Sequence, residues 1–91
     1  MRRAARVDGN QAEIMAAFRK CGFSVADTSK VGGGFPDLVI ARAGFTALVE
    51  VKIPKGKLRQ SQTDFAAAWK GHSFIVRNLG DVAHVAHLLT P

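Results

Sequence analysis

The stretch GGGFPDLVIARAGFTALVEVKIPKGK, residues 32–57, contains two apolar runs that are rich in β-branched residues and are separated by Ala43-Gly44. Runs of this composition are typical of strands, and a short glycine-containing connection is typical of a hairpin turn. The stretch therefore predicts two paired strands, at residues 37–42 and 46–53. Two carboxylates and a lysine, Asp37, Glu50 and Lys52, stand among these apolar residues and need an explanation.

The predicted hairpin brings these three charges together. Alternate residues of a strand face the same side, about 7 Å apart, so Glu50 and Lys52 project together. The turn near Gly44 lies about midway between positions 37 and 50, and hairpin pairing consequently brings Asp37 close to Glu50. One face of the second strand is therefore apolar, and the other carries a carboxylate and an amine.

The remainder of the chain predicts helices and strands around this hairpin. Helical spacing of apolar residues predicts a helix over residues 10–21, with Asn10 as its N-cap and Gly22 just past its end. A short strand follows within residues 23–31. Further along the chain, the sequence predicts a helix that begins at Ser61 and stops at Gly71, a strand at 72–78, and a last helix capped by Asp81. The order α-β-β-β-α-β-α predicts an α/β fold, a mixed sheet flanked by helices.

Length and composition limit the class of protein. A chain of 91 residues predicts one domain over residues 1–91, with residues 1–8 as a basic start, and 22% charged residues indicate a globular chain. A single cysteine and the lack of a signal-peptide pattern or a long apolar run predict a cytoplasmic protein with no membrane partner. The net charge of +6 favours a polyanionic partner such as nucleic acid, although a basic protein without one is the alternative.

Two carboxylates held close together repel each other, so one takes up a proton or both share a cation. Mg²⁺ or Mn²⁺ suits such a pair, because these ions accept carboxylate and carbonyl oxygens and bind substrate phosphates. With Lys52 beside the ion, Asp37 and Glu50 would provide the parts needed for phosphodiester hydrolysis. The alternative is an exposed sheet face on which the three residues form ordinary surface pairs.

The motif GGGFPDLVI followed by LVEVK resembles the PD-(D/E)XK nuclease signature. Together with DGNQAEIMAAFRKCGFSV and QTDFAAAWKG, it resembles the small stand-alone VRR-NUC domain proteins, many of them from phages and bacteria, over about residues 8–77. The resemblance implies a restriction-endonuclease-like core and divalent-metal-dependent cleavage of DNA, without an organic cofactor, in a bacterial or phage-infected cell. It also implies a homodimer that acts on branched DNA such as four-way junctions.

The resemblance implies a role for each site residue. Asp37 and Glu50 match the metal ligands, with the Val51 carbonyl a further ligand, and Lys52 matches the catalytic lysine. Glu13 matches an acidic residue on the first helix near the metal, although its position three residues after Asn10 also suits a capping role. Gln62 matches the active-site glutamine of a later helix, and Gln60 is the alternative.

Further residues are predicted to contact DNA. Lys55, Lys57 and Arg59 follow the catalytic strand and would meet phosphates beside the scissile bond, unless they form a solvated basic loop. Gly33 and Gly34 would let the backbone lie close to DNA or turn sharply before Asp37. Two rival functions stay open, a basic nucleic-acid-binding module that does not cut and a small protein-interaction domain.

Overall fold

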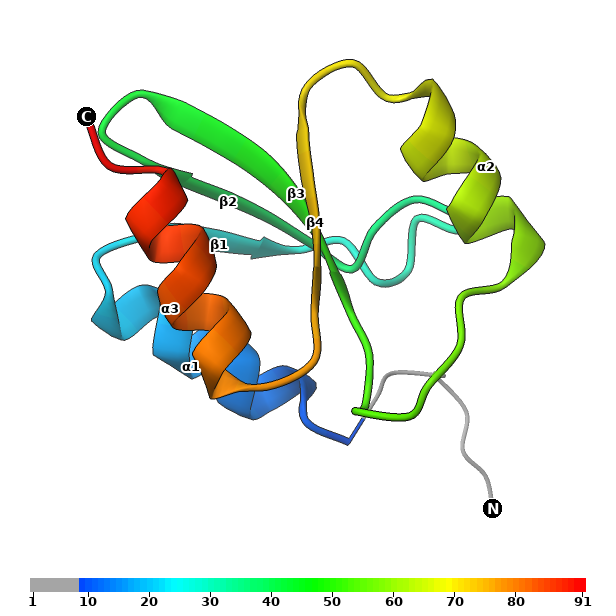
Figure 1. Ribbon diagram of the computed structural model, residues 1–91, viewed down its shortest axis with the longest axis horizontal. Helices are drawn as coiled ribbons and strands as arrows, with labels where there is room; N and C mark the ends of the chain where they lie inside the picture. The colour runs from blue at the N-terminus through cyan, green and yellow to red at the C-terminus, as the bar shows by residue number, and fades with distance from the viewer. Residues whose placement is uncertain (1–8) are drawn as a thin grey trace.

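The computed structural model describes residues 9–91, and the prediction of a basic start at residues 1–8 lies outside this part of the chain (Figure 1). The elements are α1 (Gln11–Lys20), β1 (Ser24–Asp27), β2 (Leu38–Arg42), β3 (Phe45–Val51), α2 (Gln60–Ala68), β4 (His72–Val76) and α3 (Leu79–Leu88). This order confirms the predicted α/β fold. Within residues 9–91, no helix has the length and apolar character needed to cross a membrane.

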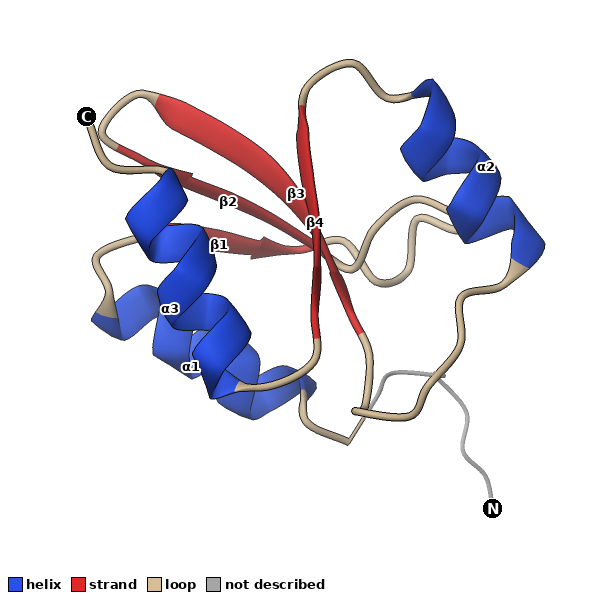
Figure 2. Cartoon of the chain, in the orientation of Figure 1, coloured by secondary structure: helices blue, strands red, loops and turns tan. Residues whose placement is uncertain are grey.

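The four strands form one mixed sheet in the order β1-β2-β3-β4 (Figure 2). The first three strands are antiparallel neighbours, whereas β4 returns parallel to β3 after the crossover through α2. The hairpin turn has positive φ at both Ala43 (53°) and Gly44 (84°), the conformation of a two-residue turn whose twist matches that of the flanking strands. The predicted hairpin therefore forms, with Leu38 opposite Val49.

The hydrophobic core lies on one face of the sheet, beneath α1 and α3. Ile14 and Phe18 of α1 and Val85 of α3 are buried there against Ile40 and Val49 of the sheet. Helix α2 lies apart from this pair of helices in Figure 2, and Gln62 is the only buried residue of α2. Because side chains alternate along β3, Glu50 points to the face opposite Val49 and Val51, on the side where α2 lies. The fold thus completes its core on one face and leaves the other for α2 and the charged residues.

Helix α1 starts where the sequence predicts, whereas the starts of α2 and α3 differ from the predicted ones. Asn10 is the N-cap residue of α1, but its side chain makes no capping hydrogen bond. Helix α2 begins one residue before Ser61, and Gln62 Oε1 accepts a hydrogen bond from the Arg59 backbone N–H at 2.8 Å. Helix α3 is capped by Asn78, whose Oδ1 accepts from Asp81 N–H at 2.8 Å, so the prediction that Asp81 is the cap was wrong.

Candidate active site

The predicted charged residues meet where β2 begins and β3 ends. Asp37 precedes β2, Glu50 lies in β3 and Lys52 follows the end of β3. The β2–β3 register pairs Leu38 with Val49, and its continuation by one residue sets Asp37 opposite Glu50. The backbone N–H of Lys52 donates to the Val76 carbonyl at 3.0 Å, which holds this residue against β4. Both Glu50 and Lys52 are buried.

Glu50 is the electrostatic centre of this group. Its residue is 7% exposed, and burial together with the neighbouring charge and hydrogen bond of Asp37 raises its pKa to about 8. Lys52 Nζ lies 3.7 Å from Glu50 Oε2 and acts in the opposite direction on the pKa. Burial and the like charge of Asp37 dominate over Lys52 and over Arg59, whose charge also lowers this pKa, so at neutral pH the metal-free pair holds a proton. A bound cation would replace that proton.

Asp37 is fixed by backbone contacts on both sides. Its Oδ2 accepts a hydrogen bond from the Val51 N–H at 2.9 Å, which ties the carboxylate to β3. Thr28 contributes two further contacts, from its N–H to the Asp37 carbonyl at 2.7 Å and from its Oγ1 to the Pro36 carbonyl at 2.8 Å. The Pro36-Asp37 segment is therefore held in place before any ligand binds.

Gln62 is the glutamine that the structure places beside Glu50. Its Nε2 donates to Glu50 Oε2 at 2.7 Å, and its Oε1 accepts from the Arg59 backbone N–H. Because the Arg59 N–H can only donate, the oxygen of the Gln62 amide must face it, and the NH₂ group therefore faces the Glu50 carboxylate. Gln60 is exposed and donates instead to Asp64 Oδ1 at 2.8 Å, within α2.

If the expected metal-dependent cleavage takes place here, Gln62→Ala should reduce it by about 10- to 100-fold, because Glu50 would lose the donor that orients its carboxylate. The check is the single-turnover cleavage rate at saturating metal, compared with that of Gln60→Ala. A larger loss in the Gln60 variant would contradict this assignment.

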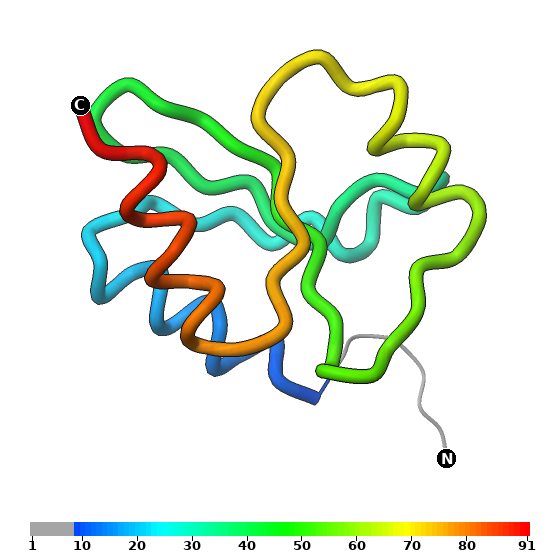
Figure 3. The backbone as a smooth tube through the Cα atoms, in the orientation of Figure 1, coloured from blue at the N-terminus to red at the C-terminus, as the bar shows by residue number. Residues whose placement is uncertain are grey.

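The glycine-rich loop before Asp37 packs against α2, as the tube in Figure 3 shows. Gly34 is buried at φ +83°, and a Cβ at this position would lie 2.3 Å from the Ser61 carbonyl oxygen. The close approach at Gly34 is thus to the chain itself, and contact of this residue with DNA stays a prediction. Gly33 is exposed with open space around it, and its contact with DNA stays a prediction.

The structure also tests which residues could hold a metal ion. Residues 9–91 contain no cluster of three or more His, Cys, Asp and Glu side chains that could bind one. Glu13 is exposed on α1 and does not join Asp37 and Glu50 in such a cluster. Mg²⁺ characteristically takes one or two protein carboxylates and completes its shell with water and substrate phosphate. The pair of Asp37 and Glu50 fits that donor set without Glu13, and the Val51 carbonyl stays a predicted further ligand.

Two residues to which the sequence pattern gave no role at the site, Asn10 and Arg77, organise its edge. Asn10 Nδ2 donates to the carbonyls of Lys52 at 3.2 Å and Arg77 at 3.1 Å, and so joins the ends of β3 and β4 to α1. The guanidinium of Arg77 donates to the carbonyls of Ile53, Pro54 and Gly56, the shortest contact being 2.6 Å. No local spacing signals these contacts, because the partners lie more than 20 residues apart.

Arg77 holds the start of the basic loop that follows Lys52. Lys55, Lys57 and Arg59 are all exposed on this connection between β3 and α2. Their positive charges therefore face solvent on the chain segment that links Lys52 to Gln62. Phosphate groups of a polyanion could reach them there.

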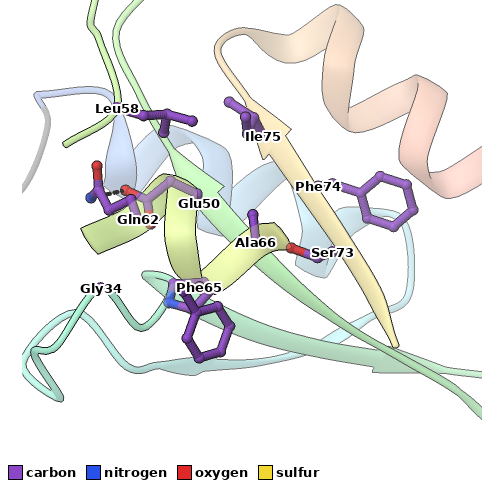
Figure 4. A pocket seen from close by; sticks show the side chains of 10 residues that line it. Gly34, Glu50, Leu58, Gln62, Phe65, Ala66, Ser73, Phe74 and Ile75 are labelled. Carbon is purple, nitrogen blue, oxygen red and sulfur yellow. Dashed lines mark hydrogen bonds between the residues drawn. The ribbon is translucent and has the colours of Figure 1, made fainter. Parts of the chain in front are cut away.

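A narrow, mostly apolar pocket of about 20 Å³ lies beside the carboxylate, between α2 and the sheet (Figure 4). Glu50 and Gln62 form its polar end, and Phe65, Ala66 and Ile75 are among its apolar lining residues. The dashed contact in Figure 4 joins Gln62 to Glu50. The apolar lining limits the access of water to Glu50 and accounts for part of its raised pKa.

The chain is thus an α/β domain with a buried Glu50, a half-buried Asp37 and a buried Lys52 at one end of its sheet, and comparisons with known proteins place it in a family. The model of the VRR-NUC domain family matches residues 3–85, so the chain belongs to the VRR-NUC family, a nuclease-type domain with a role connected to nucleic acid. A solved structure described as a VRR_NUC domain superposes with a TM-score of 0.73 at 23% identity, covering 88% of this chain and 92% of that one. That likeness supports the fold. No curated protein matches the chain.

Proposed function

We propose that this protein is a divalent-metal-dependent endonuclease that hydrolyses phosphodiester bonds in DNA. The observation that carries the proposal is the close pair of the buried Glu50 and the half-buried Asp37, with Lys52 Nζ 3.7 Å from Glu50. A structural ion pair does not need two carboxylates against one lysine, and the surplus negative charge suits a cation. Membership of the VRR-NUC family supports the same function.

Each residue has a distinct part in the proposed reaction. Asp37 and Glu50 would hold Mg²⁺ or Mn²⁺, which polarises a phosphoryl oxygen and lowers the pKa of a bound water. Lys52 would place its ammonium group near the phosphate as negative charge develops there. Gln62 orients Glu50 through its amide, and the Val51 N–H orients Asp37. Lys55, Lys57 and Arg59 would contact neighbouring phosphates.

We further propose that the substrate is DNA, branched DNA in particular, and that the protein acts as a homodimer. The net charge of +6 and the exposed basic loop support a polyanionic substrate. One site in each chain cuts one strand, so two chains related by a two-fold axis could act on paired strands of a branch point. The PD-(D/E)XK resemblance of the Pro36-Asp37 and Glu50-Val51-Lys52 segments supports the same chemistry.

The test is cleavage of labelled four-way-junction, duplex and single-stranded DNA with Mg²⁺, Mn²⁺ or EDTA. We expect cutting by the wild type with metal, and a loss of at least about 1,000-fold in Lys52→Ala, because the ammonium group acts on charge that develops in the transition state. Circular dichroism of the variant checks that the fold is kept. If the wild type binds DNA but does not cut it with either Mg²⁺ or Mn²⁺, the result would instead support the non-catalytic binding module.

A further inference from the structure

The only tryptophan of the chain, Trp69, lies immediately after the last residue of α2 and is 43% exposed. Its ring stacks on Phe65 with centroids 5.5 Å apart and an interplanar angle of 17°, and Phe65 in turn forms an edge-to-face pair with Phe35, whose ring centroid is 5.3 Å away. Trp69 follows Phe65 by four residues, a spacing that places both on one face of a helix, yet the Trp69 ring is exposed.

The neighbouring residues fix the position of the indole. The backbone N–H of Trp69 donates to the Phe65 carbonyl at 3.0 Å, which fixes the Trp69 backbone at the C-terminal end of α2. A Cβ at position 71 would lie 2.9 Å from the indole Nε1, so Gly71 leaves the space that the ring occupies. Phe65 covers part of the indole by stacking, and the exposed part is already oriented before any ligand binds.

Trp69 is connected to the candidate active site through α2. Gln62, which contacts Glu50, precedes Trp69 by seven residues, a rise of about 10 Å along a helix. Phe65, between them, lines the same pocket as Glu50 and Gln62. A stacked strand that advances about 3.4 Å per nucleotide would cover that distance in roughly three nucleotides. Lys70 is exposed and follows Trp69 in the chain, where its ammonium group can contact the phosphates of that strand.

We propose that Trp69 is a stacking subsite for an unpaired nucleobase of the DNA strand bound at the active site. The proposal rests on the proposed function and adds a source of substrate preference to it. A base inside a duplex is already stacked on both faces, whereas a base in a single strand or at a branch point can extend the Phe65–Trp69 stack. Stacking tolerates any base sequence, so the subsite selects for DNA structure.

A second copy of the chain is the other class of partner for this face. Lys70 stands beside the ring, and a net charge of +6 on each copy opposes bringing two such faces together. The same charge attracts a nucleic acid strand. The observations therefore favour DNA over self-association at Trp69.

Because Trp69 is the only tryptophan, its fluorescence reports on this ring alone. The Lys52→Ala protein in EDTA would be titrated with a single-stranded oligonucleotide, a blunt duplex of the same sequence and a duplex that carries an unpaired arm. We expect quenching by the single strand and by the armed duplex, and little quenching by the blunt duplex. Equal quenching by all three, or none, would overturn the proposal.

A second measurement uses binding affinity. In the Lys52→Ala background, Trp69→Ala should weaken binding of the single strand about tenfold and that of the blunt duplex far less, as the loss of one base–aromatic stack predicts. Trp69→Phe should restore most of the affinity, whereas Trp69→Leu, which keeps apolar contact with Phe65, should not. Equal losses for both DNA forms would assign Trp69 a structural role.

The outcomes separate this subsite from the nuclease itself. Metal-dependent cleavage without selective quenching would retain the proposed function and reject the subsite. Selective quenching without cleavage would support the stacking subsite but reject the nuclease activity, so the protein would be a non-catalytic binding module. A shift of the fluorescence with protein concentration, in the absence of DNA and matched by dimerisation in sedimentation, would place a second copy on Trp69 and overturn the proposal.

Discussion

Glu50→Gln is expected to abolish cleavage and, at pH 8 without metal, to make the protein more stable than the wild type. The neutral amide is a far weaker metal ligand than a carboxylate, so we expect a loss of at least about 1,000-fold in cleavage rate. The same substitution removes the repulsion between Glu50 and Asp37 that helps to raise the pKa of Glu50 to about 8. The residue thus provides function at the expense of stability.

The direction of the pH effect follows from the raised pKa. Between the ordinary value of 4.5 and about 8, the folded protein keeps the proton on Glu50 whereas the unfolded chain has lost it. The free energy of unfolding of the metal-free wild type therefore falls as the pH rises through this window. After allowance for relaxation of the site, we expect the free energy of unfolding of the wild type to fall by about 2 kcal/mol across this window. Glu50→Gln should not show this fall.

Urea unfolding in EDTA at pH 5 and pH 8 measures this contribution. Glu13→Gln is the matched control, because Glu13 is the only other glutamate and is exposed on α1, outside the carboxylate pair. Addition of Mg²⁺ at pH 8 should stabilise the wild type and the Glu13 variant but not Glu50→Gln. If Glu50→Gln retained the pH dependence of the wild type, the assignment of the raised pKa to Glu50 would be wrong.

Gly34→Ala should destabilise the protein by about 3 kcal/mol and reduce cleavage by at least about 100-fold. Part of the cost is the positive φ of +83°, and part is the contact of the new Cβ with the Ser61 carbonyl, 2.3 Å away. Relief of the contact requires the loop or α2 to move. Either movement displaces a site residue, because the loop leads into Asp37 and α2 carries Gln62.

Gly32→Ala separates the two causes. Gly32 has nearly the same φ, +82°, but a Cβ there meets no atom within 4 Å. This variant should lose only about 1 kcal/mol, the cost of the backbone conformation, and should keep cleavage within a few-fold of the wild type. The measurements are urea unfolding and single-turnover cleavage for both variants. Similar losses in the two would show that packing against Ser61 does not position the site.

The main site geometry was predictable because it depends on short-range rules. A turn at Ala43-Gly44 and the alternation of side chains along a strand suffice to place Asp37 near Glu50 and to put Lys52 on the same face. The helices and strands also follow from local apolar spacing and turn residues. These features need no knowledge of how the two ends of the chain meet.

The remaining features depend on contacts between distant segments. Asn10 matches an N-cap by its type, but its amide is engaged by carbonyls 42 and 67 residues further along the chain. The choice between Gln60 and Gln62 depends on how α2 crosses β3, which spacing does not determine. Trp69 has the helical position of a core residue, yet α2 buries only Gln62, so the ring stays exposed.

The hydrogen bonds of Asn10 also bear on the local unfolding of the protein. If α1 separates from the sheet, the carbonyls of Lys52 and Arg77 both lose a donor, at the ends of two parallel strands. Amide protons of α1 and of these strand ends should consequently exchange as one cooperative unit. The Lys52 backbone then keeps its hydrogen bond to Val76 but loses the one from Asn10, so partial opening at one end of the chain would loosen a site built from the middle of it.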